Sequence, residues 1–305
     1  MDDIAVVIVN YNTRDDLDRC LASVLVSQGV RHRVVVVDNC SADGSAEMVA
    51  ARYPGVELIR SDHNGGYAYA NNIGLRAAGY GQGRDLSTLP RYVLLLNPDT
   101  VLPADALARV VALMGAQPES GVLGPKLVRE DGSLDRACRR SFPTPAVSFY
   151  HLSGLGRLFP RSRRFAGYNL TYLDENQPAE VDAVVGAFML LRAQALEEAG
   201  LLDEVFFMYG EDLDLCYRIK ARGWRVRYEP SVVVLHRKGA ASRKVSRRAI
   251  IAFYDAMKLF HDKHYRAQTP FLVNWAIDGG VALLRWVALA QDRLRPAGRR
   301  RVASA

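Results

Sequence analysis

Residues 4–12 read IAVVIVNYN, and this stretch decides the fold class. Its first six residues are apolar and mostly β-branched, which predicts a strand buried on both faces, as in the interior of a parallel sheet. After this stretch in the sequence, Leu17, Leu21 and Val24 recur at the spacing of one helical face. A buried strand followed at once by an amphipathic helix is the repeating unit of a doubly wound α/β sheet.

The same alternation of strand and helix continues as far as residue 128. We therefore expect an α/β fold with a mostly parallel, Rossmann-like sheet. Residues 131–180 show no period and are predicted to form an irregular region that faces a partner. Further strands are predicted at 34–37, 56–59, 92–96, 122–128 and 232–235, regular structure at 181–191, and helices at 47–52, 68–78, 103–114, 212–221, 247–264 and 271–294.

The composition is that of a globular protein and argues against several functional classes. With 305 residues, 49% of them hydrophobic and 24% charged, the chain can bury a sizeable core. Its four cysteines lie far apart and form no CxxC pair, which disfavours a zinc ribbon or a disulfide framework and suggests the reduced thiols of a cytosolic protein. The acidic N-terminus runs directly into the first strand, so no signal peptide is expected.

Basic residues are concentrated in three runs, Arg157–Arg164, Arg243–Arg248 and Arg293–Arg301, and the net charge is +7. Such runs are either solvated surface or attract a polyanion, such as nucleic acid or an anionic membrane. We expect no nucleic-acid binding, because no helix-turn-helix, zinc or stacking-platform motif accompanies the basic runs.

Polar side chains gather where three of the predicted strands end. The segment 10–12 follows the first strand, Asp38 and Asn39 follow the second, and the segment 97–99 follows the fourth. In an open parallel sheet ligands bind beyond these carboxyl ends, so we expect a crevice suited to a nucleotide and a metal ion. The alternative is that these residues only begin turns and cap helices. Neither G-x-G-x-x-G after the first strand nor a P-loop occurs, which removes the basis for hydride transfer or P-loop chemistry.

Two pairs of residues suggest catalytic chemistry. Asp99, at a strand end, is a good ligand for Mg²⁺ or Mn²⁺ on a diphosphate, and His236 could be a second ligand or an ordinary hydrogen-bonding residue. Glu211 and Asp212 follow an aromatic-rich turn and open a helix. They either serve the helix dipole or present a general base to a pocket.

Taken as a set, these residues resemble family-two glycosyltransferases, especially the rhamnosyltransferase-like bacterial branch. The resemblance spans residues 4 to about 240, and the order and spacing of its motifs make it specific. The segments that carry it are Val9-Asn10-Tyr11-Asn12, Val36-Val37-Asp38-Asn39, Asn64-Gly65-Gly66-Tyr67 with Asn72, Leu96-Asn97-Pro98-Asp99, Gly186-Ala187-Phe188-Met189, Met208-Tyr209-Gly210-Glu211-Asp212 and His236.

The resemblance implies a GT-A fold and a role for each matched residue. Asp99 and His236 would hold Mg²⁺ or Mn²⁺, with Asn97 standing where the first aspartate of the D-x-D motif usually lies. Asp212 would be the general base, with Glu211 beside it. Nucleotide-sugar binding would fall to Asn10, Tyr11, Asn12, Asp38, Asn64, Gly66, Asn72, Asn97 and Asp99, and acceptor binding to Gly186, Ala187 and Phe188.

The expected reaction is inverting transfer of a sugar to a hydroxyl group. The branch suggests dTDP-L-rhamnose as the donor and a glycan or polyprenyl-diphosphate-linked saccharide as the acceptor. A UDP-hexose donor, or a protein that binds nucleotide sugars without catalysis, are the alternatives. The expected organisation is a GT-A catalytic domain over 1–240, with a nucleotide-sugar half (1–128) and an acceptor half (129–240), and a helical extension over 241–305.

The last predicted helix suggests a link to the membrane. Four polar residues, Asn274, Asp278, Arg285 and Asp292, fall on one stripe of it, while large apolar residues fill the rest. That pattern is typical of an interfacial helix, and it equally fits a helix packed on its own domain or in a homodimer. We expect a cytoplasmic protein, with peripheral contact at the inner face of the cell membrane as the further hypothesis.

Overall fold

The computed structural model describes residues 2–237 and 246–294. One sheet of nine strands runs through the molecule in the order β3-β2-β1-β4-β8-β6-β9-β5, with β7 beside β9. The strands are β1 (Ile4–Asn10), β2 (His32–Asp38), β3 (Glu57–Arg60), β4 (Tyr92–Leu96), β5 (Thr100–Val101), β6 (Ser120–Val128), β7 (Ala179–Val181), β8 (Phe188–Arg192) and β9 (Arg225–His236).

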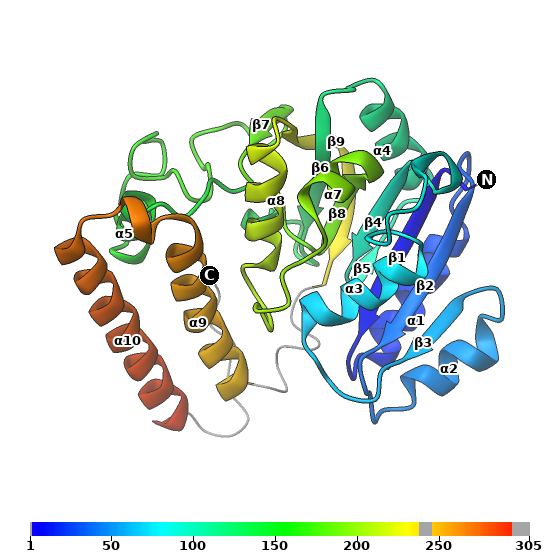
Figure 1. Ribbon diagram of the computed structural model, residues 1–305, viewed down its shortest axis with the longest axis horizontal. Coiled ribbons are helices and arrows are strands. Elements are labelled where there is room, and N and C mark those ends of the chain that lie inside the picture. The colour runs from blue at the N-terminus through cyan, green and yellow to red at the C-terminus, as the bar shows by residue number, and fades with distance from the viewer. Residues whose placement is uncertain (1, 238–245, 295–305) are drawn as a thin grey trace.

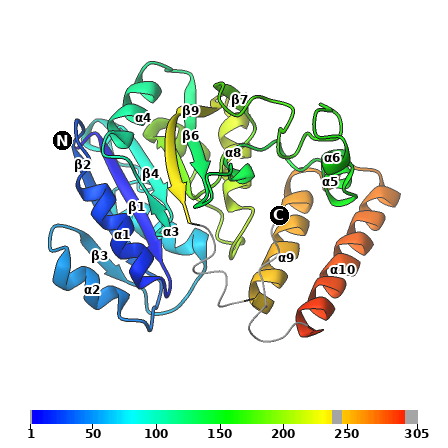
Figure 2. The same ribbon diagram turned by 180° about the vertical axis from the view of Figure 1, so that it is seen from behind.

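The helices are α1 (Arg14–Leu25), α2 (Ser45–Arg52), α3 (Tyr67–Ala77), α4 (Ala106–Gly115), α5 (Pro145–Leu152), α6 (Leu155–Leu158), α7 (Ala193–Ala199), α8 (Glu211–Ala221), α9 (Ser246–His264) and α10 (Phe271–Leu294). Helices α3, α7 and α8 cover the face of the sheet that is turned to the viewer in Figure 1, and α1 and α4 cover the face seen in Figure 2. Short 3₁₀ turns lie at Leu86–Thr88, Arg136–Cys138 and Arg266–Gln268.

The first half of the sheet is parallel, as its apolar strands predict. Strands β2, β1 and β4 pair in parallel, and β3 joins β2 in the same sense. All of Ile4–Asn10 is buried, because helices cover both faces of this half. The α/β fold is therefore confirmed, and the carboxyl ends of β1, β2 and β4 meet along one edge of the sheet.

The second half of the sheet is mixed rather than parallel. Strand β8 lies antiparallel between β4 and β6, and its first residue, Phe188, pairs with Leu96 at the end of β4. The chain therefore enters β8 at the edge where the parallel strands end. An antiparallel strand can begin at this edge, so no crossover helix is needed to bring the chain back to the opposite edge. This arrangement brings the segment before β8, with Gly186 and Ala187, to the edge of the sheet where a ligand would bind.

The region 131–180 is more ordered than its lack of period indicates. It contains α5, which begins at Pro145 in the first helical turn, and the Thr144 side chain accepts a hydrogen bond from the Val147 amide at this end. A capping threonine followed by proline is a helix-start pattern, so the sequence did hold the signal for α5.

Helices α9 and α10 form a hairpin beside α8. The polar stripe of α10 faces α9: His261 Nε2 lies 2.7 Å from Asn274 Oδ1, Asp278 accepts bonds from Lys258 and Arg266, and Arg285 donates to Asp255. Its exposed large side chains include Phe271, Trp275, Leu283 and Trp286. Within the described residues α10 is the single helix whose length and hydropathy would suffice to cross a membrane.

Candidate active site

A cleft of about 2480 Å³ opens at the carboxyl edge of the parallel strands. Three residues that are distant in the sequence line it together: Asp99 after β4, Asp212 in the first turn of α8, and His236 at the end of β9. The predicted convergence of these side chains on one cleft is therefore confirmed. Helices α5, α9 and α10 also contribute to its walls.

A hydrogen-bond network lies beneath the part of the cleft predicted to bind the nucleotide sugar. Asn10 Nδ2 donates to Asp38 Oδ1 at 3.0 Å and to Ser41 Oγ at 3.0 Å, and Asp38 Oδ2 accepts from the Ser41 amide at 3.0 Å. Asn10 and Asp38 are buried by this network and lie beneath the cleft surface. Tyr11, Asn39, Asn64, Gly66 and Asn97 line the surface itself, and the Asn12 side chain accepts from the Ala42 amide.

Gly66 allows two loops to meet at the cleft. It has φ +96°, and a Cβ there would lie 2.2 Å from the Phe207 carbonyl oxygen. The next residue, Tyr67, donates its amide to that oxygen at 2.7 Å, and its hydroxyl donates to the Gly186 carbonyl at 2.8 Å. The loop 64–67 thereby holds the turn that precedes Glu211 and the segment before β8 in place.

Asp99 and His236 are neighbours because β5 and β9 pair. Thr100 is opposite His236 in this antiparallel pair, and His236 Nε2 lies 3.3 Å from Asp99 Oδ1. The other ring nitrogen, Nδ1, lies 2.8 Å from Asp135 Oδ2. Burial opposes the charged imidazole, but the carboxylates of Asp135 and Asp99 outweigh it and raise the pKa of His236 to about 9.

Asp212 faces the cleft from the N-terminus of α8. Its Oδ2 accepts from Arg140 at 2.6 Å and from the Gly186 amide at 3.2 Å, and its Oδ1 accepts from the Leu213 amide at 2.7 Å. Both members of this ion pair are nearly inaccessible, with side-chain exposures of 9% and 7%. Three fixed donors therefore orient the carboxylate.

Glu211 lies beside Asp212 and is also buried in the cleft wall. Burial, together with the charge of Asp212, raises the pKa of Glu211 to about 8. Its Oε2 has no hydrogen-bond partner within the described part of the chain. The raised pKa favours the protonated form of Glu211, which can donate a hydrogen bond to a ligand.

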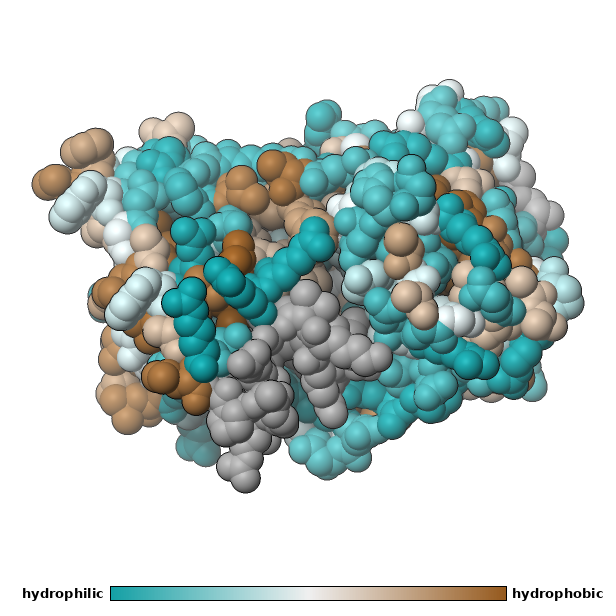
Figure 3. Space-filling model, turned by 90° about the horizontal axis from the view of Figure 1, so that it is seen from below, coloured by the Kyte–Doolittle hydropathy of each residue, from teal (hydrophilic) through white to brown (hydrophobic). Residues whose placement is uncertain are grey.

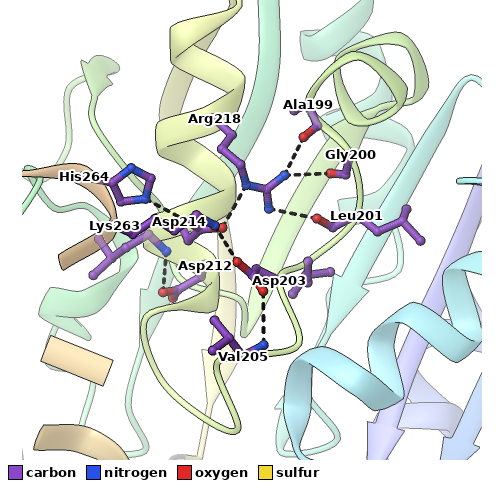
Figure 4. A network of polar contacts seen from close by, with 12 residues as sticks. Ala199, Gly200, Leu201, Asp203, Val205, Asp212, Asp214, Arg218, Lys263 and His264 are labelled. Carbon is purple, nitrogen blue, oxygen red and sulfur yellow. Dashed lines mark hydrogen bonds and ion pairs between the residues drawn. The ribbon is translucent and has the colours of Figure 1, made fainter. Parts of the chain in front are cut away.

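The third acidic residue of α8, Asp214, does not line the cleft and anchors the helix through polar contacts (Figure 4). Asp214 is fully buried and contacts Arg218 Nε at 2.8 Å, Lys263 Nζ at 2.7 Å and His264 Nε2 at 2.8 Å. Burial opposes its charge, but the hydrogen bond from His264, the charge of Arg218 and the hydrogen bonds from Lys263 and Arg218 lower the pKa of Asp214 to about 2. Because Lys263 and His264 belong to α9, this cluster fixes the C-terminal hairpin to the helix that carries Asp212.

Besides Asn10, Asn12 and Asp38, two further residues predicted for the site do not line the cleft. Asn72 is buried on α3, where its amide donates to the Leu202 carbonyl and to Glu204, so it holds a loop rather than lining the cleft. Phe188 points into the core from β8, whereas Gly186 and Ala187 do line the cleft.

The sequence reasoning missed Asp135 and Arg140, which contact His236 and Asp212. Both come from the region 131–180, where no periodic pattern marks them. Four cysteines are free thiols, as predicted.

Comparison with known proteins agrees with this geometry. The family model described as "Glycosyltransferase like family 2" matches residues 2–251. The chain is 29% identical to the N-acetylglucosaminyl-diphospho-decaprenol L-rhamnosyltransferase of Mycobacterium tuberculosis, over 99% of this chain and 97% of that relative. It is 27% identical to the low-salt glycan biosynthesis hexosyltransferase Agl10 of Haloferax volcanii, over 72% of this chain and 62% of that one.

Solved structures share the fold. The mannosyltransferase PcManGT from Pyrobaculum calidifontis, in complex with GDP-Man and Mn²⁺, superimposes with a TM-score of 0.58 at 20% identity, covering 97% of this chain and 77% of that one. GalNAc-T7 with UDP, GalNAc and Mn²⁺ gives 0.55 at 18% identity, covering 77% of this chain and 44% of that one. The predicted GT-A fold is thus confirmed, and the chain belongs to glycosyltransferase family 2, in its rhamnosyltransferase-like branch.

Proposed function

We propose that this glycosyltransferase moves L-rhamnose from dTDP-L-rhamnose to a hydroxyl group of a polyprenyl-diphosphate-linked saccharide, with inversion at the anomeric carbon. The observation that carries the proposal is that Asp99, His236, Asp212 and Glu211 line one cleft. The near full-length similarity to a rhamnosyltransferase named for a lipid-linked acceptor supports the choice of donor and acceptor.

Asp212 is the proposed general base. A carboxylate can accept about four hydrogen bonds, and three are used here, two on Oδ2 and one on Oδ1. One position on Oδ1 is therefore left for the acceptor hydroxyl. Asp212 takes the hydroxyl proton while that oxygen attacks the anomeric carbon, and the nucleoside diphosphate leaves from the opposite face. The protonated Glu211 beside it supplies a hydrogen bond to the acceptor or the donor sugar.

Asp99 and His236 fit a divalent metal ion, Mg²⁺ or Mn²⁺, whose binding would release the Nε2 proton of His236. Asp99 Oδ1 is buried, its contact with His236 Nε2 lacks hydrogen-bond geometry, and it accepts no hydrogen bond from the described residues. Asp135 holds the Nδ1 atom of His236, which is how a second carboxylate usually orients a ligating imidazole. When bound, the ion would neutralise the charge that develops on the leaving diphosphate. The described residues form no cluster of three ligands, so the remaining ligands would be diphosphate oxygens and water.

A pair of variants tests the base and the metal side together. We expect Asp212→Asn to lower turnover by roughly 10³-fold, in the range for loss of a general base, while calorimetry shows unchanged binding of dTDP-L-rhamnose with Mn²⁺. In calorimetry, Asp99→Ala should by contrast lose the Mn²⁺-dependent part of donor binding.

Near-normal turnover by Asp212→Asn would remove Asp212 from the role of base. Consumption of a UDP-hexose but not of dTDP-L-rhamnose would overturn the donor, and binding without consumption of any donor would favour a non-catalytic protein.

The outward face of α10 is the proposed contact with the inner face of the cell membrane, in an otherwise cytoplasmic protein. Phe271, Trp275, Leu283 and Trp286 are 61–79% exposed on it. Hydrophobic residues gather along the edge of the molecule that α10 forms, at the left of Figure 3. Exposed tryptophans on an amphipathic helix favour the interface between lipid and water.

A further inference from the structure

Helices α9 and α10 each turn a stripe of apolar residues toward the catalytic cleft. Phe253 and Met257 of α9 line it at a spacing of four residues. On α10, Val273, Ile277, Val281 and Leu284 line it at spacings of four, four and three. These are the spacings of a single helical face, so the two stripes form one apolar trough along the hairpin.

The trough is continuous with the catalytic centre at one end. The Tyr209 ring, two residues before Glu211, lies 5.8 Å from the Phe253 ring. Because the hairpin is antiparallel, with Arg285 bonded to Asp255, Leu284 also lies at this end and Val273 at the far end. From Val273 to Leu284 the trough extends for roughly 16 Å at the rise of an α-helix.

The apolar stripe of α10 lacks a full protein covering. Val273 is 41% exposed, and Ile277, Val281 and Leu284 are only half-buried. The polar stripe of α10 is already bonded to α9, so the helix cannot rotate to bury these side chains without breaking those bonds. The hairpin thus presents unfilled apolar surface to the interior of the cleft.

A cation lies where the trough meets the centre. Arg248, in the first turn of α9, stacks over the Phe207 ring at 4.3 Å and lines the cleft. It has no acidic partner among the residues that the structure describes. The polar catalytic centre, the cation and the apolar trough thus follow one another along the cleft. A ligand with a polar head, an anionic group and an apolar tail in that order would match them.

We propose that the trough holds the polyprenyl chain of the acceptor, with its diphosphate at Arg248 and its saccharide at Asp212. This inference rests on the proposed function, because it assigns a site to the lipid part of that acceptor. It also gives the C-terminal hairpin a role in substrate binding, through the face of α10 that adjoins the membrane-facing one.

Two adjacent glycines of α10 provide a matched test. Gly280 lines the cleft in the middle of the trough, whereas Gly279 is exposed on the outer side, and a Cβ at either position would meet nothing within 4 Å. Gly280→Phe should fill the trough, and Gly279→Phe should not. In detergent solution, Gly280→Phe should raise the KM for N-acetylglucosaminyl-diphospho-decaprenol about tenfold, which corresponds to losing the burial of about two methylene groups. Gly279→Phe should leave that KM unchanged.

The same variants are assayed with an acceptor that carries a short alkyl chain in place of the prenyl chain. Both should then match the parent protein, which shows that the catalytic centre is intact. An equal KM for Gly280→Phe and Gly279→Phe with the decaprenyl acceptor would overturn the trough while leaving the proposed function standing.

Photolabelling makes the test independent of turnover. A geranylgeranyl diphosphate analogue with a terminal benzophenone should label residues of α9 and α10 that face the trough, and Gly280→Phe should suppress the labelling at least severalfold. Labelling confined to other surfaces would overturn the inference even if rhamnosyl transfer is observed. Labelling of the trough in a protein that transfers no rhamnose would instead support the lipid site and reject the proposed function.

Discussion

The parallel half of the sheet and the C-terminal hairpin distribute apolar residues in opposite ways. In the first, the residues Ile4–Val9 are at most 9% exposed and the polar side chains gather at the strand ends. In α10 the polar residues Asn274 and Asp292 are buried, while Phe271 is 79% and Trp275 71% exposed. The first pattern is that of a core which is complete by itself. The second leaves apolar surface uncovered on two sides, which is the pattern of a region that meets lipid.

A pair of leucines offers the sharpest test of this contrast. Leu94 on β4 is fully buried, so Leu94→Ala should lower the free energy of unfolding by roughly 4 kcal/mol. Leu283 on α10 is 61% exposed, and Leu283→Ala should change it by less than about 0.5 kcal/mol. Urea denaturation measures both values, and flotation with anionic vesicles should show weaker binding for Leu283→Ala alone. Equal destabilisation by the two variants would mean that α10 is covered in solution, for example by a second copy of the chain.

The attachment of the hairpin to α8 should produce the next largest effect. Asp214→Ala leaves Arg218, Lys263 and His264 without their shared buried carboxylate and should cost roughly 3 kcal/mol of stability at neutral pH. Since its pKa is lowered to about 2, this contribution is present above the unfolded value of 3.8 and is lost as the pH falls toward 2.

Asp203→Ala is the matched control for Asp214→Ala. It removes another partner of Lys263 whose side chain is 34% exposed, so it should cost less than about 1 kcal/mol in the same urea titration. If both variants cost the same, the buried cluster does not anchor the hairpin.

Local patterns explain why the parallel half could be predicted from the sequence. Each strand is a continuous apolar run, and polar residues such as Asp38 and Asp99 follow directly, so their meeting at one edge depends only on parallel pairing. Asp135 and Arg140 could not be found in this way. They belong to a segment without regular period, and their partners His236 and Asp212 lie 101 and 72 residues further along the chain.

The hairpin shows a different limit of sequence reasoning. The polar stripe of α10 was correctly identified, but a stripe alone does not show whether it faces water or protein. Here it faces α9, because three of its residues bond to that helix: Asn274 to His261, Asp278 to Lys258 and Arg285 to Asp255. Partners of this kind become visible only when both helices are placed.

Glu211, which lies between the two regions, should give the smallest of the three effects. Its pKa is raised from an ordinary value of 4.5 to about 8 in the folded protein. Burial is the largest cause, and the negative charges of Asp212 and Asp214 raise the pKa further, while the positive charge of Arg140 lowers it. Between these values the folded state keeps a proton that the unfolded state has lost. The free energy of unfolding should therefore fall as the pH rises, by up to about 1.4 kcal/mol per pH unit. Glu211→Gln removes this dependence of the unfolding free energy on pH. Other groups that titrate between pH 4.5 and pH 8 affect the parent protein and the variant alike. Urea titrations at pH 6 and pH 7 should accordingly show a smaller fall for Glu211→Gln than for the parent, and identical falls would mean that Glu211 is already ionised beside Asp212.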